Sequence, residues 1–206
     1  VSSYLLGEIL HDINFPVGVI NILTGPPEKV ATTMTKSNIP SVVTMIGSTK
    51  TGKQVIADSS SSIKKLSMEL GGNAPFIVFD DADMNAAIDL AIGIKFGNCG
   101  QICVAANRFF VHENIYDDFL TSYVDRVRKL KLGFGKDSDG DMGPLVNRQG
   151  QKRMKDIVSD AITKGATIET GGKIPEDFDK GYWFEPTVLS NVTPDMVAYQ
   201  QETFGP

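Results

Sequence analysis

The 206 residues correspond to one or two domains at about 150 residues each, and a composition of 41% hydrophobic and 22% charged residues excludes wholesale disorder. With 20 basic against 25 acidic residues, the net charge of −5 argues against a nucleic-acid or membrane-surface binder, which would need a basic face. Two cysteines are too few for a disulfide framework, and no apolar run reaches the roughly 20 residues of a spanning helix. We therefore expect a reducing compartment, cytoplasmic or, in a eukaryote, the mitochondrial matrix. The chain begins without Met or the features of a signal peptide and reads as a piece of a longer protein.

The first third of the chain has the pattern of a parallel α/β sheet. Strands are predicted at 17–23, 41–46 and 65–70, with helical stretches between them and the turn Thr24-Gly25-Pro26-Pro27 after the first strand. The run at 41–46 is apolar enough to predict a strand buried on both faces. Strands that alternate with helices are typical of a parallel sheet with crossover connections.

A second unit is predicted from Gly71-Gly72, which divides the chain into 1–70 and 71–206. Its expected strands lie at 76–79, at 108–111 and near 184–189. Asp80-Asp81-Ala82-Asp83 supplies caps for a helix that begins at Met84, and apolar spacing predicts further helices over 115–130 and 154–162.

The glycine loop from Gly47 to Lys53 nearly matches the P-loop pattern, with four residues between Gly47 and Gly52. It also follows a strand and opens a helix. However, Gln54 stands where a Ser or Thr hydroxyl should coordinate magnesium, which argues against a nucleotide–metal site. A plain strand-to-helix turn and a weaker phosphate site at the helix N-terminus both stay open.

Cys99 and Cys103 are four residues apart and could share a helix face. The only histidines are His11 and His112, so we expect no zinc site, and i,i+4 cysteines on a helix seldom meet disulfide geometry. A lone Cys is most often a buried small hydrophobe. Because Gly100 frees the backbone ahead of Cys103, we predict that Cys103 is the reactive thiol and that Cys99 is not.

Glu69 ends an apolar strand just before two glycines, and two interpretations are open. Its carboxylate is either an exposed strand end or, if it is buried against a cleft, a general base with a raised pKa.

The order of these motifs resembles the aldehyde dehydrogenase superfamily. Met68-Glu69-Leu70-Gly71-Gly72-Asn73-Ala74-Pro75 is followed by Gly100-Gln101-Ile102-Cys103, and the likeness continues to Glu202-Thr203-Phe204-Gly205-Pro206. Within the superfamily, residues 72–80 and 103–108 look most like succinate-semialdehyde dehydrogenases.

The resemblance implies half of a Rossmann-like parallel sheet followed by most of an α/β catalytic domain. It implies NAD(P)-dependent oxidation of an aldehyde, succinate semialdehyde or a related short one, through a thiohemiacetal and a thioester. Cys103 would be the nucleophile and Glu69 the base that activates the deacylating water, with no metal. The implied residues for NAD or NADP are Gly25, Gly47, Ser48, Leu70, Glu202 and Phe204.

Several residues depart from the family pattern, and one of these departures predicts a change in substrate selectivity. Gly97 stands where succinate-semialdehyde dehydrogenases carry an Arg for the substrate carboxylate, and loss of such a partner removes about 1.5–3 kcal/mol of recognition. An Arg from segments outside this chain could compensate, and Lys95 is a weaker nearby cation because it lacks the planar fork of Arg. We expect uncharged short aldehydes to compete well. Met45-Ile46 replaces the usual Phe-Thr, so a hydroxyl near the nicotinamide is lost. Gln201 stands where an acidic residue commonly precedes Glu202.

The family's Asn for the oxyanion and its Lys for the adenosine ribose would lie upstream of Val1. The alternatives are therefore a catalytically inactive truncated piece, a P-loop protein, which Gln54 disfavours, and a CoA-acylating enzyme, which Glu69 disfavours. The expected partners are a small aldehyde and, in the parent enzyme, one or three further copies of the chain, without nucleic acid or membrane.

Overall fold

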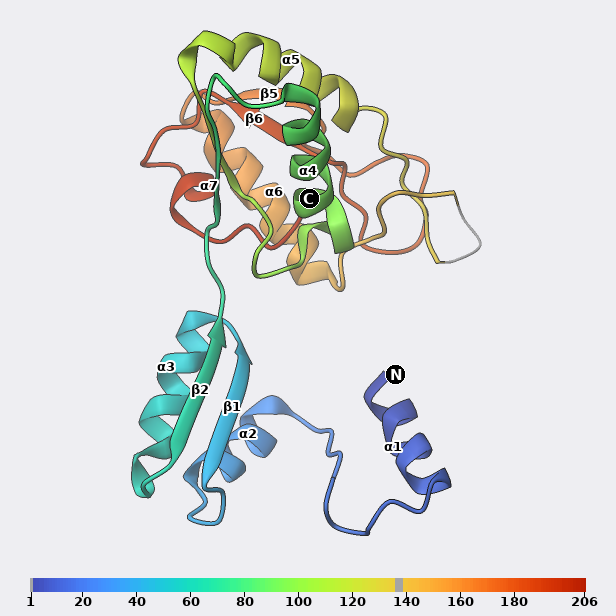
Figure 1. The fold of residues 1–206 in the computed structure, drawn as a ribbon, viewed down its shortest axis with the longest axis vertical. Coiled ribbons are helices and arrows are strands. Elements are labelled where there is room, and N and C mark those ends of the chain that lie inside the picture. Colours follow the sequence, from blue (N-terminus) through green and yellow to red (C-terminus); the bar gives the residue numbers. More distant parts are fainter. Residues whose placement is uncertain (1, 136–138) are drawn as a thin grey trace. The chain divides into compact units, whose positions relative to one another are not determined.

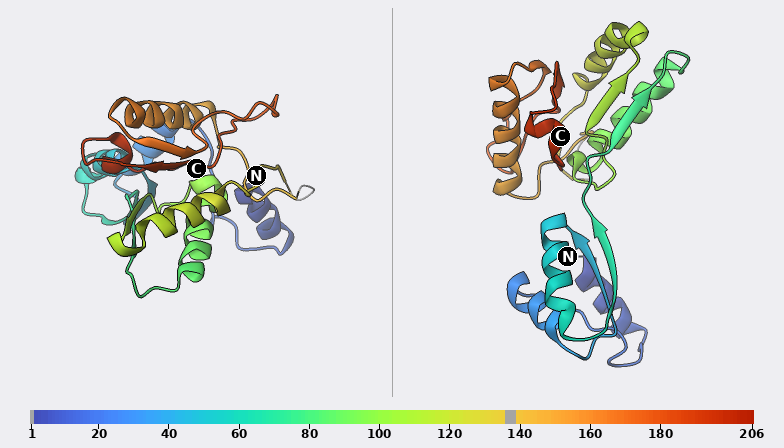
Figure 2. Two further views of the ribbon diagram at one scale, coloured as in Figure 1. Left: turned by 90° about the horizontal axis from the view of Figure 1, so that it is seen from above. Right: turned by 90° about the vertical axis from the view of Figure 1, so that its left-hand side faces the viewer.

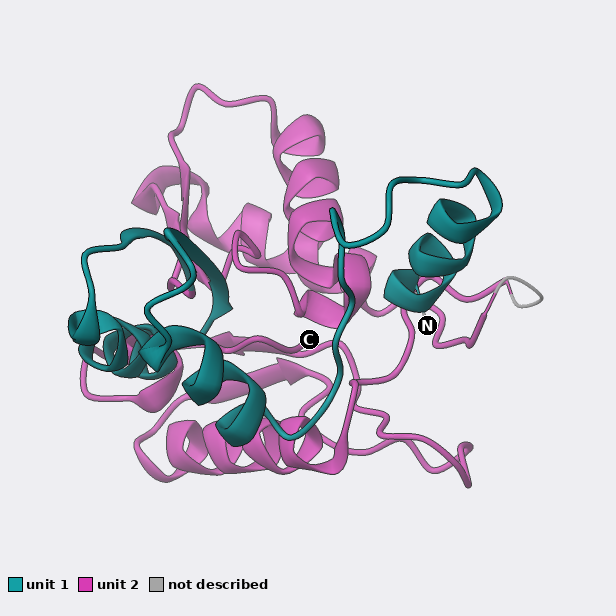
Figure 3. Cartoon of the chain, turned by 90° about the horizontal axis from the view of Figure 1, so that it is seen from below, with its two compact units in different colours: residues 1–70 teal, residues 71–206 magenta. Residues whose placement is uncertain are grey.

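The computed structural model describes residues 2–135 and 139–206 and is shown in Figure 1. The chain divides into two compact units, Val1–Leu70 and Gly71–Pro206, which Figure 3 draws in different colours. Each unit has its own sheets and helices and is described by itself. None of the helices in the described part of the chain is long and apolar enough to cross a bilayer.

The first unit is built on a parallel strand pair with a helical crossover. Val42 pairs with Lys65 and Gly47 with Leu70, and the helix α3 (Thr49–Asp58) packs against both strands. Ser48 caps this helix, because its hydroxyl accepts a hydrogen bond from Thr51 N at 3.1 Å. The predicted strand–helix–strand order of residues 41–70 is thus confirmed. The elements in order are α1 Ser2–Asp12, α2 Pro27–Lys36, β1 Val42–Gly47, α3 Thr49–Asp58, the 3₁₀ turn Ser59–Ser61 and β2 Lys65–Leu70.

Two predictions for this unit are wrong. Residues 17–23 form turns and irregular backbone instead of a strand, and Val17 and Leu23 are exposed. A strand needs a neighbour to complete its hydrogen-bond ladder, and in this unit the described ladder joins only β1 and β2. Nor is β1 buried on both faces: Val43 and Met45 are half-buried, whereas Val42 and Ile46 are exposed on the other face.

The second unit contains a parallel pair and an antiparallel pair of strands. β3 (Pro75–Val78), one residue earlier than predicted, pairs in parallel with β4 (Arg108–Val111), which has the predicted bounds. β5 (Thr167–Thr170) pairs with β6 (Val188–Ser190) in antiparallel fashion. The strand expected near 184–189 is shorter and later than predicted, at β6. The elements are β3 Pro75–Val78, α4 Met84–Phe96, the 3₁₀ turns Gly97–Gly100 and Glu113–Ile115, β4 Arg108–Val111, α5 Tyr116–Val127, α6 Arg148–Thr163, β5 Thr167–Thr170, β6 Val188–Ser190 and α7 Val197–Gln200.

The core of the molecule lies in this second unit. β5 packs against both α5 and α6, which lie on its two sides in Figure 2, and α4 packs against α5. Asp83 caps α4 as predicted, through a 3.1 Å hydrogen bond from Ala86 N. The fully buried apolar side chains include Ile88, Val127, Met142, Met154, Phe184 and Met196. This packing fixes α4, and α4 in turn carries the cysteine loop that follows it.

Candidate active site

Cys103 lies exposed at a tight turn between α4 and β4. The turn is closed by a hydrogen bond from Ala105 N to the Ile102 carbonyl at 3.0 Å. The backbone N–H of Cys103 itself donates to no residue that the structure describes. The turn therefore presents a thiol and a free backbone donor at the same residue.

The chain reaches this turn through a left-handed segment. After α4 ends at Phe96, Asn98, Cys99 and Gly100 have φ values of 50°, 58° and 67°. The two cysteines therefore do not share a helix face, because the right-handed helix stops before either of them. A Cβ on Gly100 would lie 2.2 Å from the Gly205 carbonyl oxygen, so this position needs glycine for its space as well as for its φ.

Two side chains brace the left-handed segment. Asn98 Nδ2 donates to the Gln101 carbonyl at 3.2 Å, and Gln101 Nε2 donates back to the Asn98 carbonyl at 3.1 Å. Gln101 Oε1 also accepts from Val146 N at 3.0 Å. Such strained backbone persists only when its surroundings hold it. These contacts support the left-handed residues within 97–107, a segment called the thiol loop below.

The two thiols have different environments. Cys99 is buried, and burial raises the pKa of its thiol to about 12, although the Lys95 ammonium opposes this shift. Both cysteines are free. Because the thiolate is the nucleophile, a buried thiol that stays neutral is inert, and Cys103 is the accessible sulfur.

Lys95 does not have the role that the sequence suggested for it. The sequence suggests it as a cation for a substrate carboxylate, but its side chain is buried. Its Nζ donates to Asn107 Oδ1 at 3.0 Å and to the Gly205 carbonyl at 2.9 Å. Burial lowers the pKa of this amine to about 8. The ammonium is engaged inside the protein, so the prediction is wrong.

Glu202 places a carboxylate oxygen inside the second unit without a partner. Its Oε1 is buried and has no hydrogen bond within the described residues. The carboxylate lies directly over Gly71, since a Cβ there would be 2.1 Å from Oε2. An orphaned acceptor of this kind fits a ligand hydroxyl, which is what a ribose presents. Residues 201–205 are called the Glu202 segment below.

Phe204, in the same segment, has a φ of 49° and is fixed by α6. Arg153 Nη2 donates to the Phe204 carbonyl at 2.9 Å, and its guanidinium carbon lies 5.9 Å from the centroid of the phenyl ring. The two contacts hold both the backbone and the ring of this residue.

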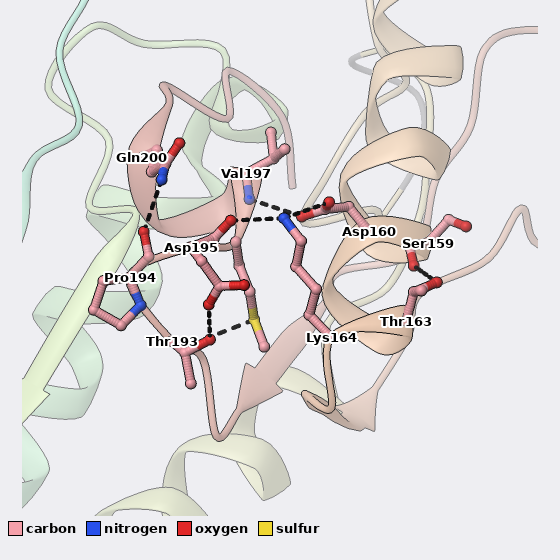
Figure 4. Close-up of polar contacts among 10 residues, drawn as sticks. Ser159, Asp160, Thr163, Lys164, Thr193, Pro194, Asp195, Val197 and Gln200 are labelled. Atoms are coloured by element: carbon pink, nitrogen blue, oxygen red, sulfur yellow. Dashed lines mark hydrogen bonds and ion pairs between the residues drawn. The ribbon is translucent and has the colours of Figure 1, made fainter.

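Asp195 and Val197, which precede the Glu202 segment, are hydrogen-bonded to side chains at the end of α6 (Figure 4). Lys164 Nζ pairs with Asp160 Oδ1 at 2.8 Å and donates to the Asp195 carbonyl at 2.6 Å. Asp160 Oδ2 accepts from Val197 N, the first residue of α7, at 2.8 Å. The Lys164 hydrogen bond and the backbone N–H together hold the pKa of Asp160 below its usual value. α7 is thereby fixed just ahead of Glu202.

Arg108 holds the backbone at the start of the second unit in place. Its Nε and Nη2 donate to the Asn73 carbonyl at 2.9 and 2.7 Å, and its guanidinium stacks 5.3 Å from the Tyr199 ring centroid. Asn73 Nδ2 donates to the Tyr199 carbonyl. Sequence reasoning did not single out Arg108, Asp160 or Lys164, because each bonds to a carbonyl or N–H distant in the chain.

The remaining predicted site residues lie in the first unit. Ser48 caps α3, and Glu69 is exposed on β2 opposite Ile46. Leu70 ends β2 and packs against Gly52, where a Cβ would be 2.7 Å from Leu70 Cδ2.

Gly25 and Gly47 mark the two turns of the first unit. A Cβ on Gly25 would lie 2.8 Å from Val30 Cγ2, so this turn folds closely onto α2. Gly47 ends β1 opposite Leu70. Gln54, the residue that breaks the P-loop pattern, bonds Asp58 one turn further along α3 at 3.1 Å. The side chain at the magnesium position of that pattern is thus used within the helix. Across residues 2–135 and 139–206, no group of three His, Cys, Asp or Glu side chains could hold a metal ion.

Comparison with known proteins gives a match over the entire chain. The model of the aldehyde dehydrogenase family matches residues 1–206. A succinate-semialdehyde dehydrogenase [NADP(+)] of Schizosaccharomyces pombe is 45% identical over 202 residues, which are 98% of this chain and 41% of the relative. A 3,6-anhydro-alpha-L-galactose dehydrogenase of a Vibrio species is 40% identical over 100% of this chain and 43% of its own length.

Solved structures agree with the sequence match. The betaine aldehyde dehydrogenase of Staphylococcus aureus in complex with NAD+ superposes with a TM-score of 0.96 at 35% identity, covering 100% of this chain and 41% of that one. The chain therefore spans less than half the length of the relatives that it matches.

Proposed function

Because the chain belongs to the aldehyde dehydrogenase family, we propose that it is the central part of an NAD(P)-dependent dehydrogenase that oxidises an aldehyde to a carboxylic acid. Residues 1–70 would form the C-terminal half of the cofactor domain, and residues 71–206 the thiol domain without its C-terminal part. The observation that carries the proposal is the exposed Cys103 on a tight turn, with a backbone N–H that donates to none of the described residues.

The chemistry assigned to the chain's own residues begins at Cys103. Its thiolate adds to the aldehyde carbon, and the negative charge that develops on the oxygen is stabilised by a nearby N–H donor, for which the Cys103 backbone is the candidate. Bound NAD or NADP supplies the hydride acceptor. For Glu69, which is exposed within residues 1–70, we keep the role that the family resemblance implies, to accept a proton from the water that hydrolyses the thioester on Cys103.

The Glu202 carboxylate is the best-supported cofactor contact in the second unit. Its buried, unpartnered Oε1 fits a ribose hydroxyl, and Phe204 lies two residues on for the nicotinamide. For the first unit, taken by itself, the cofactor contacts that we propose are Gly25, Gly47, Ser48 and Leu70. The family includes a relative named for NADP(+) and a structure with NAD+, so we propose NAD or NADP without choosing between them.

For the substrate we propose succinate semialdehyde or a related short aldehyde, with weak selectivity for the acid. Lys95 is occupied inside the protein, and Gly97 brings no cation. The test compares kcat/KM for succinate semialdehyde and butanal in the full-length protein and in Gly97→Arg. We expect the wild-type ratio to stay below about a hundredfold and to rise in Gly97→Arg by about tenfold, the worth of one charge-assisted pair. Either a larger wild-type preference or an unchanged ratio in the variant contradicts this assignment.

The role of Cys103 is tested in the same full-length protein. Cys103→Ala should lower kcat/KM by about a thousandfold or more, because a covalent nucleophile has no replacement. Cys99→Ala, the matched control, should retain most of the activity. Mass mapping after brief iodoacetamide treatment should find the label on Cys103. Label on Cys99, or equal losses in the two variants, would reverse the assignment.

A second candidate function is a folded but inactive piece, which the 41% coverage of the relative favours for these 206 residues taken alone. Loss of one oxyanion donor costs about 10²–10³ in rate, and the family's second donor is expected upstream of Val1. We expect the 206-residue chain to reduce neither NAD nor NADP at a measurable rate with an aldehyde. Turnover at the rate of the full-length protein would remove this candidate.

We further propose that the parent enzyme is a homodimer or homotetramer in a reducing compartment, cytoplasm or mitochondrial matrix. The two free cysteines agree with such a compartment.

A further inference from the structure

The side chain of Lys95 connects two segments that are far apart in the sequence. Its acceptors are Asn107 Oδ1, at the end of the thiol loop, and the Gly205 carbonyl, 110 residues away in the chain. Lys95 itself lies just ahead of the thiol loop, one residue before α4 ends. One amine thus ties both ends of the thiol loop to the Glu202 segment.

The same carbonyl also lies against the middle of the thiol loop. A Cβ on Gly100 would come within 2.2 Å of Gly205 O and within 3.0 Å of the Lys95 carbonyl oxygen. The Gly205 carbonyl is therefore seated between the Lys95 amine and the left-handed residues that lead to Cys103. A shift of the Glu202 segment would have to move the thiol loop or break this hydrogen bond.

An apolar side chain would fill this interior position at a lower cost in desolvation. Lys95 is 7% exposed, and both of its hydrogen-bond acceptors are neutral carbonyl oxygens. Burial of an ammonium without a counterion is expensive, and replacement of buried charged groups by apolar ones is often neutral or stabilising. What an apolar residue cannot supply is a donor that fixes both acceptors at once.

We propose that Lys95 is a positioning residue, whose amine couples the placement of the Cys103 turn to that of the Glu202 segment. The coupling rests on the proposed function for its purpose, since the Glu202 segment would hold the nicotinamide ribose and Cys103 would attack the aldehyde. A cofactor bound at Glu202 would then act, through Gly205 and Lys95, on the orientation of the thiol.

The experiment uses the full-length protein and measures the iodoacetamide alkylation rate of Cys103 with and without saturating NAD or NADP. The ratio of the two rates is the coupling. In Lys95→Met we expect this ratio to move at least about threefold toward one, and the dissociation constant of the cofactor to rise about tenfold, as for a lost hydrogen bond to a charged group. Lys155→Met, an exposed lysine of α6, is the matched control and should keep both wild-type values.

Asn107 provides a second pair of variants should Lys95→Met fail to fold. Asn107→Ala removes one acceptor and should lower the coupling, whereas Asn107→Asp keeps an oxygen at that position and should restore it. Hydrogen exchange supplies a readout that needs neither cofactor nor aldehyde. In Lys95→Met, amides of both residues 97–107 and residues 201–205 should exchange faster.

The outcomes separate this inference from the proposed function. Faster exchange in both segments together with reduced coupling supports the role of Lys95. An unchanged coupling in Lys95→Met, or faster exchange in one segment only, overturns it. If the full-length protein neither binds NAD or NADP nor oxidises an aldehyde, the proposed function fails, and the exchange result alone decides whether Lys95 links the two segments.

Discussion

The two units use the same strand–helix–strand pattern but bury their apolar side chains to different extents. In Gly71–Pro206, a continuous cluster that includes Ile88, Tyr123 and Phe184 is nearly inaccessible to solvent. Among the described residues of the first unit, Val55 is the single apolar side chain that is fully buried. The difference shows that a βαβ pattern specifies local elements, whereas burial requires further layers on both faces of the sheet.

The largest expected effect comes from a matched pair of helical isoleucines. Ile88 on α4 is 1% exposed and Ile56 on α3 is 50% exposed. Ile88→Ala should lower the free energy of unfolding of the second unit by about 3–4 kcal/mol through lost burial and a cavity, and Ile56→Ala should cost less than about 1 kcal/mol. Urea denaturation of the 206-residue chain measures both. Equal costs would mean that the first unit is packed as tightly as the second.

A pair of glycines sharpens the contrast within the second unit. Gly100→Ala places a Cβ against the Gly205 carbonyl at a left-handed φ, and should destabilise the unit by about 2 kcal/mol. A methyl group on Gly93, inside α4, would meet open space, so Gly93→Ala should stabilise the unit by about 0.5–1 kcal/mol. Thermal melting of the two variants should give shifts of opposite sign, and shifts of the same sign would contradict the tight approach at Gly100.

Proteolysis compares the units directly. Cleavage requires local opening, and opening is easiest where few apolar contacts must break. Trypsin should therefore cut before Leu70 about tenfold faster than after Gly71, at equal protease concentration. Mass spectrometry of early digests identifies the sites. First cuts within α5 or α6 would invert the expected order of stability.

The smallest effect is a pH dependence that belongs to the second unit, which holds both cysteines. The pKa of Cys99 is raised from 9.0 to about 12 by burial, so in the folded state the thiol keeps its proton above pH 9, whereas in the unfolded state it loses it. Stability contributed by this thiol is therefore present below pH 9 and is lost as the pH rises toward 12.

At pH 9 the loss should be roughly half a kcal/mol relative to neutral pH. Cys99→Ala lacks this loss. The titration of Lys95 occurs in both proteins and is governed mainly by its burial, so the comparison of the two proteins isolates the thiol. Denaturation curves at pH 7 and pH 9 for both proteins provide the measurement. Parallel pH profiles would contradict the burial of the thiol.

The sequence predicted the bounds of an element correctly where the residues that cap or end it agreed with the hydrophobic periodicity. The strands 65–70 and 108–111 have the predicted bounds, and Asp83 caps α4. The strand expected at 17–23 failed because a run of β-branched residues encodes a propensity and not a partner. No window of neighbouring residues contains the ladder that such a strand would need.

In the candidate site, too, local features could be predicted from the sequence and long-range contacts could not. Gly100 ahead of Cys103 indicated an exposed thiol, and the structure has that thiol exposed and Cys99 buried. Lys95 could not be assigned from the sequence, because its acceptor at Gly205 is 110 residues away. From the sequence alone, a lysine in the last turn of an apolar helix is expected to be exposed. Its burial becomes evident only when the segment that packs against it is known. The roles of Glu69, Ser48 and Phe204 stay predictions.

The contact between Gly71 and Glu202 makes these two positions depend on each other in evolution. Every residue other than glycine has a Cβ, and a Cβ at position 71 would lie 2.1 Å from Glu202 Oε2. Because this oxygen is the end of a flexible side chain, a substitution at position 71 would turn the carboxylate aside and change what it can bind. The two positions, 131 residues apart in the chain, should therefore behave as an epistatic pair in any library that samples both.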